Sequence, residues 1–221
     1  MQQKATPNGD ALNIRWSQAY DVLSNDNVEL LWRHAKACLL HSRQATEVSK
    51  KESLLQQARQ AIKFALDRSD EHFDVLKCAA LVSSEIANLL KEPDRDELKK
   101  FKKYADRALD IDADDFDLLY LRARYHFTNP QFSWIRHFCS FCPATSFDLA
   151  IDDFQQAAVL RPGQYIEIHY YLALCFIAKD DVKSALQHLR IADDLAPVDS
   201  VHRRMKGEVR DLLVRFESKG F

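Results

Sequence analysis

Residues 185–197 read Ala-Leu-Gln-His-Leu-Arg-Ile-Ala-Asp-Asp-Leu-Ala-Pro. Ala185, Leu189 and Ala192 share one face of a helix, because residues three and four positions apart are neighbours there. The two small residues let another helix approach closely, and the large residue between them fills the remaining space. Pro197 ends the helix because it has no N–H to donate.

The same order of Ala, a large apolar residue and Ala recurs over residues 58–65 and 150–157. Pro162 lies five residues after Ala157, just as Pro197 lies five residues after Ala192. Small–large–small spacing followed by Pro is typical of the second helix of a tetratricopeptide repeat (TPR). A further copy has the sizes exchanged, with Phe101 in place of Ala and Ala105 in place of the large residue, a swap that conserves volume.

Equivalent positions of the four copies, which begin at Ala58, Phe101, Ala150 and Ala185, lie 43, 49 and 35 residues apart. The last step is close to the TPR period of about 34 residues, and the longer steps indicate enlarged internal turns. We therefore predict an all-α, TPR-like right-handed superhelix of antiparallel helix pairs with a C-terminal capping helix. An irregular helical bundle is the alternative.

The domain organisation follows from where the apolar periodicity starts and stops. Residues 1–10 are predicted to be a disordered tail, residues 11–217 a single TPR-like domain, and residues 218–221 a second tail. An aromatic and cysteine-rich insert, 128–146, interrupts the third helix pair. After a short amphipathic segment at 14–23, the expected pairs are 28–45 with 51–67, 72–90 with 94–111, 116–127 with 147–160 and 165–178 with 181–196, followed by a capping helix at 200–217.

Composition argues against several classes of function. Lys and Arg number 31 and Asp and Glu 33, so the net charge of -2 gives no attraction of the whole molecule to nucleic acid or to a membrane. Only 4 glycines are present, and the sequence contains neither a dinucleotide nor a Walker motif nor His-Glu-x-x-His. We predict no enzymatic activity and no cofactor. The odd number of cysteines, 5, argues against a disulfide framework and favours a reducing, cytoplasmic environment. The lack of an apolar run of about 20 residues predicts a soluble protein without a membrane span.

Two sequence patterns suggest metals, and we predict that neither binds one. Cys139 and Cys142 form a C-x-x-C that could hold zinc with His137 and His126, but thiols are also small apolar fillers of an aromatic insert. The acidic run at 110–117 resembles the start of a calcium loop, yet it lacks the Gly and the bidentate Glu that such a loop requires. We expect Asp114 or Asp115 to cap the next helix instead.

Two basic clusters are candidates for binding an acidic polymer surface. The first consists of Lys99, Lys100, Lys102 and Lys103, which flank Phe101. The second consists of Arg203, Arg204 and Lys206, with Arg210 one turn further on, all on the last helix. The competing interpretation of both is a solvated helix face balanced by nearby carboxylates.

The first helices of the predicted pairs would line a concave groove that could bind a peptide. Candidate groove residues are Arg33, Lys36, Lys77, Arg122 and Arg124. Tyr120 and Tyr125 alternate with the two last arginines, a mixture suited to a binding groove. This groove is the basis of the alternative function, a peptide-binding adaptor.

Three stretches together resemble the regulator of microtubule dynamics family. Residues 29–37, Glu-Leu-Leu-Trp-Arg-His-Ala-Lys-Ala, resemble its first-helix signature. Residues 146–151, Ser-Phe-Asp-Leu-Ala-Ile, and the segment that continues to Pro162 are similar to its helix after the insert, and residues 169–195 resemble its closing repeat. The resemblance covers residues 12–215.

This resemblance implies a non-enzymatic, cytosolic protein with tubulin and microtubules as partners. It implies a place at the cytoskeleton, the spindle and the spindle poles, and a contribution to microtubule dynamics and chromosome segregation. We expect the two basic clusters to meet the acidic tubulin surface. The adaptor function is the second hypothesis, and a zinc hydrolase that uses the insert is a distant third.

Overall fold

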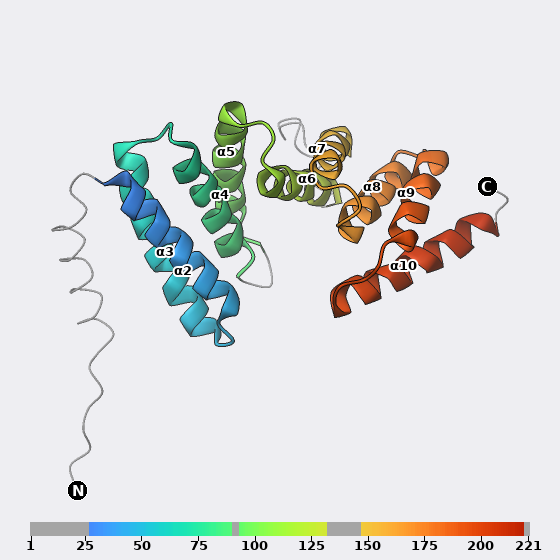
Figure 1. Cartoon of the computed structure of the whole chain (residues 1–221), viewed down its shortest axis with the longest axis horizontal. Coiled ribbons are helices and arrows are strands. Elements are labelled where there is room, and N and C mark those ends of the chain that lie inside the picture. Colours follow the sequence, from blue (N-terminus) through green and yellow to red (C-terminus); the bar gives the residue numbers. More distant parts are fainter. Residues whose placement is uncertain (1–26, 90–92, 132–146, 219–221) are drawn as a thin grey trace, which may run out of the picture. The chain divides into compact units, whose positions relative to one another are not determined.

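The computed structural model of the chain describes residues 27–89, 93–131 and 147–218, and every regular element in these ranges is an α-helix (Figure 1). The prediction of an all-α fold is therefore confirmed for the described residues. The helices are α2 (Val28–Gln44), α3 (Val48–Arg68), α4 (Phe73–Ala87), α5 (Arg95–Ile111), α6 (Phe116–Gln131), α7 (Phe147–Leu160), α8 (Ile166–Ala178), α9 (Val182–Asp194) and α10 (Ser200–Glu217).

The chain divides into two compact units, and the boundary falls between Tyr104 and Ala105, inside α5. Each unit is described by itself below. The single-domain organisation over 11–217 stays a prediction. Residues 1–26, 90–92, 132–146 and 219–221 lie outside the described residues, and with them the predicted N-terminal tail, the amphipathic segment at 14–23, most of the insert and most of the C-terminal tail.

In the first unit, α2 packs along α3, and α4 contacts both helices. The shared core contains Leu31 and Leu55, which are 0% and 1% exposed. Ala58 and Ala65 have no exposed surface, as the small–large–small pattern predicts. Burial of each large side chain contributes roughly 1.5–3 kcal/mol, and the alanines permit the close approach that makes this burial complete.

In the second unit, α7 contacts both α6 and α8, α9 packs on α8, and α10 contacts α8 and α9. All three pattern residues of α7, Ala150, Phe154 and Ala157, are 0% exposed. The same holds for the pattern residues of α9. Helix α10 contributes Val209 and Leu213 to the core that it shares with α8 and α9, so the last helix covers an apolar face as a cap should.

Several helix ends differ from the expected positions. Helix α9 ends at Asp194, two residues before the expected end, because a residue that precedes Pro is driven out of the helical region. Helix α6 continues to Gln131, through residues that we assigned to the insert. Pro130 lies in its last turn, where the missing N–H removes a single backbone hydrogen bond.

Aspartates cap three helices of the second unit. The carboxylate of Asp115 accepts a hydrogen bond from the backbone N–H of Leu118 at 3.0 Å, which confirms the predicted cap of α6. Asp181 caps α9 and Asp199 caps α10 in the same way. Asp180 adopts a φ of 62° between α8 and α9, which allows a very short turn between the two helices.

One ion-pair cluster joins three helices of the second unit. The guanidinium of Arg122 on α6 donates two hydrogen bonds to the carboxylate of Asp153 on α7, at 2.8 and 2.7 Å. It donates a third to Asp106 on α5 at 3.1 Å. The side chain of Asp153 is only 8% exposed. Removal of the arginine would therefore leave a buried carboxylate without its counter-charge, which costs much more than the loss of an exposed pair.

We predict that Arg122→Ala lowers the free energy of unfolding by about 3–5 kcal/mol, as measured by urea denaturation followed by circular dichroism. The matched control is Arg33→Ala, because Arg33 pairs with Glu29 at 2.7 Å on an exposed surface. The control substitution should lower the free energy of unfolding by less than about 1 kcal/mol. Equal effects of the two substitutions would contradict a structural role for the buried cluster.

Two histidines face each other between α8 and α9. The Nδ1 atoms of His169 and His188 are 3.1 Å apart, and the ring of Phe176 stacks on His188 at 5.5 Å between centroids. Burial and the adjacent His169 lower the pKa of His188 to about 4. Burial also lowers the pKa of His169. An unfolded chain binds these protons near the ordinary histidine pKa of about 6.5, so acid favours the unfolded state.

We predict that the protein loses stability as the pH falls from about 6.5 towards 4, by up to about 1.4 kcal/mol per pH unit for each such histidine. His188→Gln keeps hydrogen-bonding groups but does not titrate, so it should flatten this dependence. The measurement is the urea midpoint at several pH values, with His41→Gln, an exposed histidine of α2, as the control. An unchanged slope in His188→Gln would refute the assignment.

Candidate functional site

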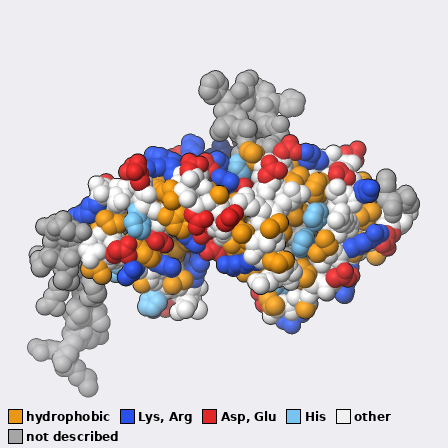
Figure 2. Space-filling view, turned by 45° about the horizontal axis from the view of Figure 1, so that its top comes forward, with side chains coloured by type: hydrophobic (Ala, Val, Ile, Leu, Met, Phe, Trp, Pro, Cys, Tyr) orange, Lys and Arg blue, Asp and Glu red, His pale blue; other side chains and the backbone are white. Residues whose placement is uncertain are grey.

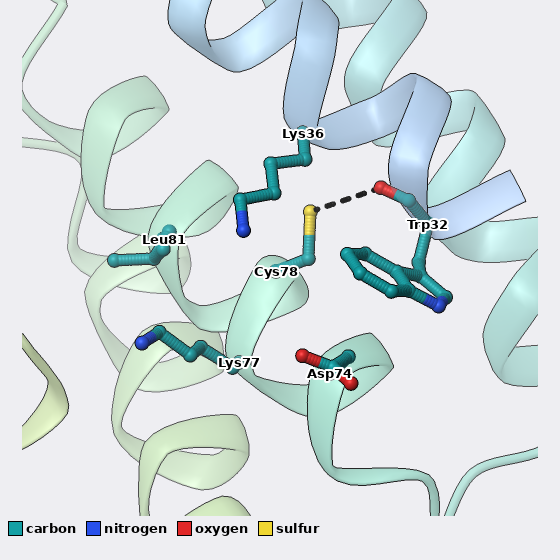
Figure 3. A pocket seen from close by; sticks show the side chains of 6 residues that line it. All are labelled: Trp32, Lys36, Asp74, Lys77, Cys78 and Leu81. Atoms are coloured by element: carbon teal, nitrogen blue, oxygen red, sulfur yellow. Dashed lines mark hydrogen bonds between the residues drawn. The ribbon is translucent and has the colours of Figure 1, made fainter. Parts of the chain in front are cut away.

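The first helices of the pairs contact one another within each unit: α2 contacts α4 in the first, and α8 contacts α6 in the second. Helix α8 also contacts the capping helix α10. In the first unit this contact forms a small pocket of about 20 Å³. Trp32 and Lys36 extend into it from α2, and the remaining lining residues come from α4 (Figure 3). These are Asp74, Lys77, Cys78 and Leu81.

Cations surround the indole of Trp32. The guanidinium carbon of Arg33 lies 5.3 Å and the ammonium of Lys36 lies 5.6 Å from the ring centroid. The indole N–H of Trp32 is buried and has no hydrogen-bond partner among the described residues. Three of the five predicted groove residues, Arg33, Lys36 and Lys77, thus lie on α2 and α4 at or beside one pocket. An aromatic ring with adjacent cations suits a partner that carries carboxylates.

The thiol in this pocket does not offer chemistry. The Sγ of Cys78 lies between Lys36 and the backbone carbonyl of Trp32, to which it donates a weak hydrogen bond at 3.8 Å (Figure 3). Burial raises the pKa of Cys78 to about 12. Because only the thiolate is a good nucleophile, this cysteine is unreactive near neutral pH.

The other two predicted groove residues, Arg122 and Arg124, have different roles. All of the ion pairs of Arg122 described above are internal, so it stabilises the fold. Arg124 lies with its guanidinium carbon 4.2 Å from the ring centroid of Tyr171 and donates to the hydroxyl of Tyr120 at 3.1 Å. Its Nε is buried without a hydrogen-bond partner in the described part of the chain.

A polar pair joins the first helix α8 to the capping helix α10. Glu167 of α8 accepts a hydrogen bond from Nε2 of His202 of α10 at 2.7 Å. The other carboxylate oxygen of Glu167 is buried and unpartnered among the described residues. In the second unit, Nε of Arg124 and one carboxylate oxygen of Glu167 are thus buried polar atoms without a hydrogen-bond partner among the described residues.

The four lysines of the first basic cluster are not equivalent. Lys99 and Lys103 are exposed, and Lys99 pairs with Asp96 at 3.0 Å. Lys100 is also exposed, but it donates to Glu97 at 2.7 Å, and Glu97 is only 3% exposed and also pairs with Arg59, so this lysine is held by a buried carboxylate. Lys102 is half-buried, and its side chain is not free. Lys99 and Lys103 are thus the cations best placed to meet a partner.

The second basic cluster lies on α10. Arg203 and Arg204 are exposed, whereas Lys206 is half-buried and donates to the backbone carbonyl of Leu195 at 2.8 Å. Arg203 and Lys206 line an open hollow of about 380 Å³. Figure 2 shows Lys and Arg side chains lying among Asp and Glu side chains on the visible face of the described residues, so any attraction there must be local.

The structure describes one of the two metal-like patterns in full and only one residue of the other. His137, Cys139 and Cys142 lie outside the described residues, and His126 is buried in α6. Within the described ranges, no group of three or more His, Cys, Asp or Glu side chains could hold a metal ion. In the acidic run, Asp115 is engaged in the α6 cap.

Sequence reasoning did not select three of the residues that shape these faces. Trp32 stands within the Leu-Leu-Trp-Arg run but was treated as a family signature. Glu167 was not singled out because its partner His202 is distant in sequence. Gly207, which also lines the hollow on α10, could have been noticed as a glycine inside an otherwise strong helical pattern.

Solved structures of low sequence identity share the fold. MamA from Desulfovibrio magneticus RS-1 superposes with a TM-score of 0.57 at 17% identity, over 84% of this chain and 84% of that one. A TPR protein of Thermus thermophilus gives 0.52 at 17% identity, over 90% and 89% of the two chains. YrrB, described as a TPR protein with an unusual peptide-binding site, gives 0.50 at 15% identity, over 87% and 97%. The predicted TPR-like fold class is therefore confirmed.

Residues 8–217 match the family described as Regulator of microtubule dynamics protein 1-3. A protein of that name, number 1, from Caenorhabditis elegans is 27% identical over 193 residues, which are 84% of this chain and 84% of the relative. Number 2 from Macaca fascicularis is 24% identical over 211 residues, and the match spans 89% of this chain but 51% of that relative. Among the described helices, none is long and apolar enough to cross a bilayer. Because the family match extends over nearly the whole length, the chain belongs to the regulator of microtubule dynamics family.

Proposed function

We propose that this protein is a non-catalytic helical scaffold that binds microtubules and influences their dynamics. Membership of the regulator of microtubule dynamics family over residues 8–217 is the observation that carries the proposal. The relatives from the worm and the macaque are named as regulators of microtubule dynamics.

The chemistry of the described residues supports binding over catalysis. The cysteines Cys38, Cys78 and Cys175 are buried. Burial raises the pKa values of Cys78 and Cys175 to about 12, so neither supplies a thiolate near neutral pH. The exposed surface of these helices carries charged side chains, and half-buried aromatic rings lie beside some of them, an arrangement that suits recognition of another protein.

The mechanism that we propose is electrostatic docking on the acidic surface and tails of tubulin. Lys99 and Lys103 of the first unit and Arg203 and Arg204 of the second would supply the cations. One exposed pair contributes roughly 0–1 kcal/mol, so several must act together. Such binding weakens as salt rises, because exposed charges are screened within about 8–10 Å at physiological ionic strength.

The finer parts of the proposal concern location. Binding to microtubules would place the protein at the cytoskeleton, the spindle and the spindle poles, and would connect it with chromosome segregation. A cytoplasmic location belongs to the same proposal. These parts depend on microtubule binding and fall with it.

A second candidate function, a peptide-binding adaptor, is favoured by the faces of the first helices. In one unit the ring of Trp32 lies beside Lys36 and Lys77 at the pocket, and in the other the guanidinium of Arg124 lies over the ring of Tyr171. Rings with adjacent cations suit a peptide that carries carboxylates. The structural neighbour YrrB is described as having a peptide-binding site. An adaptor would need a third protein, whereas the first proposal needs tubulin polymer alone.

We predict that the double substitution Lys99→Glu/Lys103→Glu weakens cosedimentation with purified microtubules about tenfold, since it replaces two attractive contacts by two repulsive ones. Raising the salt from low to physiological concentration should also weaken microtubule binding by the wild-type protein. Circular dichroism verifies that the double variant remains helical.

The matched control is Lys50→Glu/Lys63→Glu, which changes the net charge equally at two exposed lysines of α3. If both double variants bind as the wild type does, the first basic cluster has no role in binding. If the wild type itself sediments only when a third protein is added, the adaptor replaces the scaffold that binds directly.

A further inference from the structure

Helix α10 contains a glycine for which its own fold gives no reason. Gly207 lies in the middle of Ser200–Glu217 and is exposed to solvent. Glycine inside a helix destabilises it by about 0.5–1 kcal/mol relative to alanine. A Cβ placed at Gly207 would have no atom within 4 Å, outside the glycine's own neighbourhood along the helix. The packing of the described residues therefore does not require a glycine here.

The surroundings of Gly207 form an open basic hollow. Its volume is about 380 Å³, and its lining consists of Gly207 with Pro197, Arg203, Lys206 and Arg210. Positions 203, 207 and 210 follow one another along a single face of the helix. Arg203 lies one turn before Gly207 and Arg210 lies one turn after it. The missing side chain of Gly207 therefore leaves a gap between two cations, which we call the notch.

The cations around the notch still have hydrogen-bond donors to offer. Arg203 has no ion pair within the described residues and is exposed. Lys206 donates to the carbonyl of Leu195, which leaves two of its three donors. Arg210 donates through Nε to Asp193 at 2.7 Å, and this bond positions its guanidinium, whose other N–H groups remain. Among the described residues, no carboxylate lines the hollow itself.

We propose that this hollow is a docking site for an extended, Glu-rich segment of a protein partner. Carboxylates of the segment would pair with Arg203 and Arg210, because the planar guanidinium matches a carboxylate with two parallel hydrogen bonds. The backbone of the segment would pass over Gly207, where the lack of a Cβ permits close approach. This inference deepens the proposed function and rests on it, since the acidic tails of tubulin are segments of this chemistry.

The test measures binding of a fluorescent Glu-rich peptide to the full chain by anisotropy. Gly207→Leu fills the notch without changing any charge. It should weaken peptide binding about tenfold or more, a change of about 1.4 kcal/mol, while the urea midpoint stays the same or rises, because leucine favours a helix more than glycine does. Binding and stability that move in opposite directions identify a docking role. Gly207→Ala should give an intermediate loss, and Arg203→Gln a loss of about threefold to tenfold.

The control for added bulk is Val201→Leu, an exposed position of α10 outside the hollow, which should bind as the wild type does. A peptide with every Glu replaced by Gln should not bind. The proposal is overturned if the Glu-rich peptide does not bind, if Gly207→Leu binds it normally, or if a single-stranded oligonucleotide binds the hollow more tightly than the peptide.

Parallel cosedimentation with microtubules separates this inference from the proposed function. If the wild type and Gly207→Leu sediment equally well, microtubule binding stands and the hollow has no part in it. If the wild type does not sediment but binds the Glu-rich peptide in a way that depends on Gly207, the docking site stands and its partner is another acidic protein.

Discussion

Close contact of helices over alanine is the constraint on which the rest of this structure depends. Ala58, Ala150, Ala157 and Ala185 are all 0% exposed, and each lies on a helix that packs between or against others of its unit. Only a side chain of this size lets two helix backbones approach so closely that the large residues between them become fully buried. The same contacts set first helices side by side, and so they create the faces on which Trp32 and Arg124 lie.

Charged residues of one type have opposite roles here, and the burial of the carboxylates with which they pair decides between these roles. Arg122 is taken up by Asp153 and Asp106 and stabilises the second unit, whereas Arg203 on α10 faces solvent. Lys99 and Lys100 are both exposed, but Lys100 is held by the buried Glu97, whereas Lys99 pairs with the exposed Asp96. A surface of mixed charge with a net charge of -2 can therefore carry local cationic sites, each of which depends on neighbours that hold or release its side chains.

The fold could be predicted from sequence because alanine spacing and proline positions are local signals, whereas much of the candidate site could not. The ends of α9 and α6 were misplaced because the positions near Pro197 and Pro130 depend on how far each last turn tolerates a missing N–H. The partners of Arg122 lie on two other helices. Its ion pairs depend on how these helices pack, and a local stretch of sequence does not predict them. The open space beside Gly207 likewise appears only when α10 is placed against the loop that contains Pro197.

The most direct test of this account compares two adjacent alanines of α7 by urea denaturation. Ala157 is fully buried at a helix contact, and Ala158 is partly exposed. Leucine at position 157 should force the helices apart and lower the free energy of unfolding by about 1–3 kcal/mol, whereas leucine at position 158 should change it by less than about 0.5 kcal/mol. Equal and small effects at both positions would show that close packing over alanine does not hold the helices together.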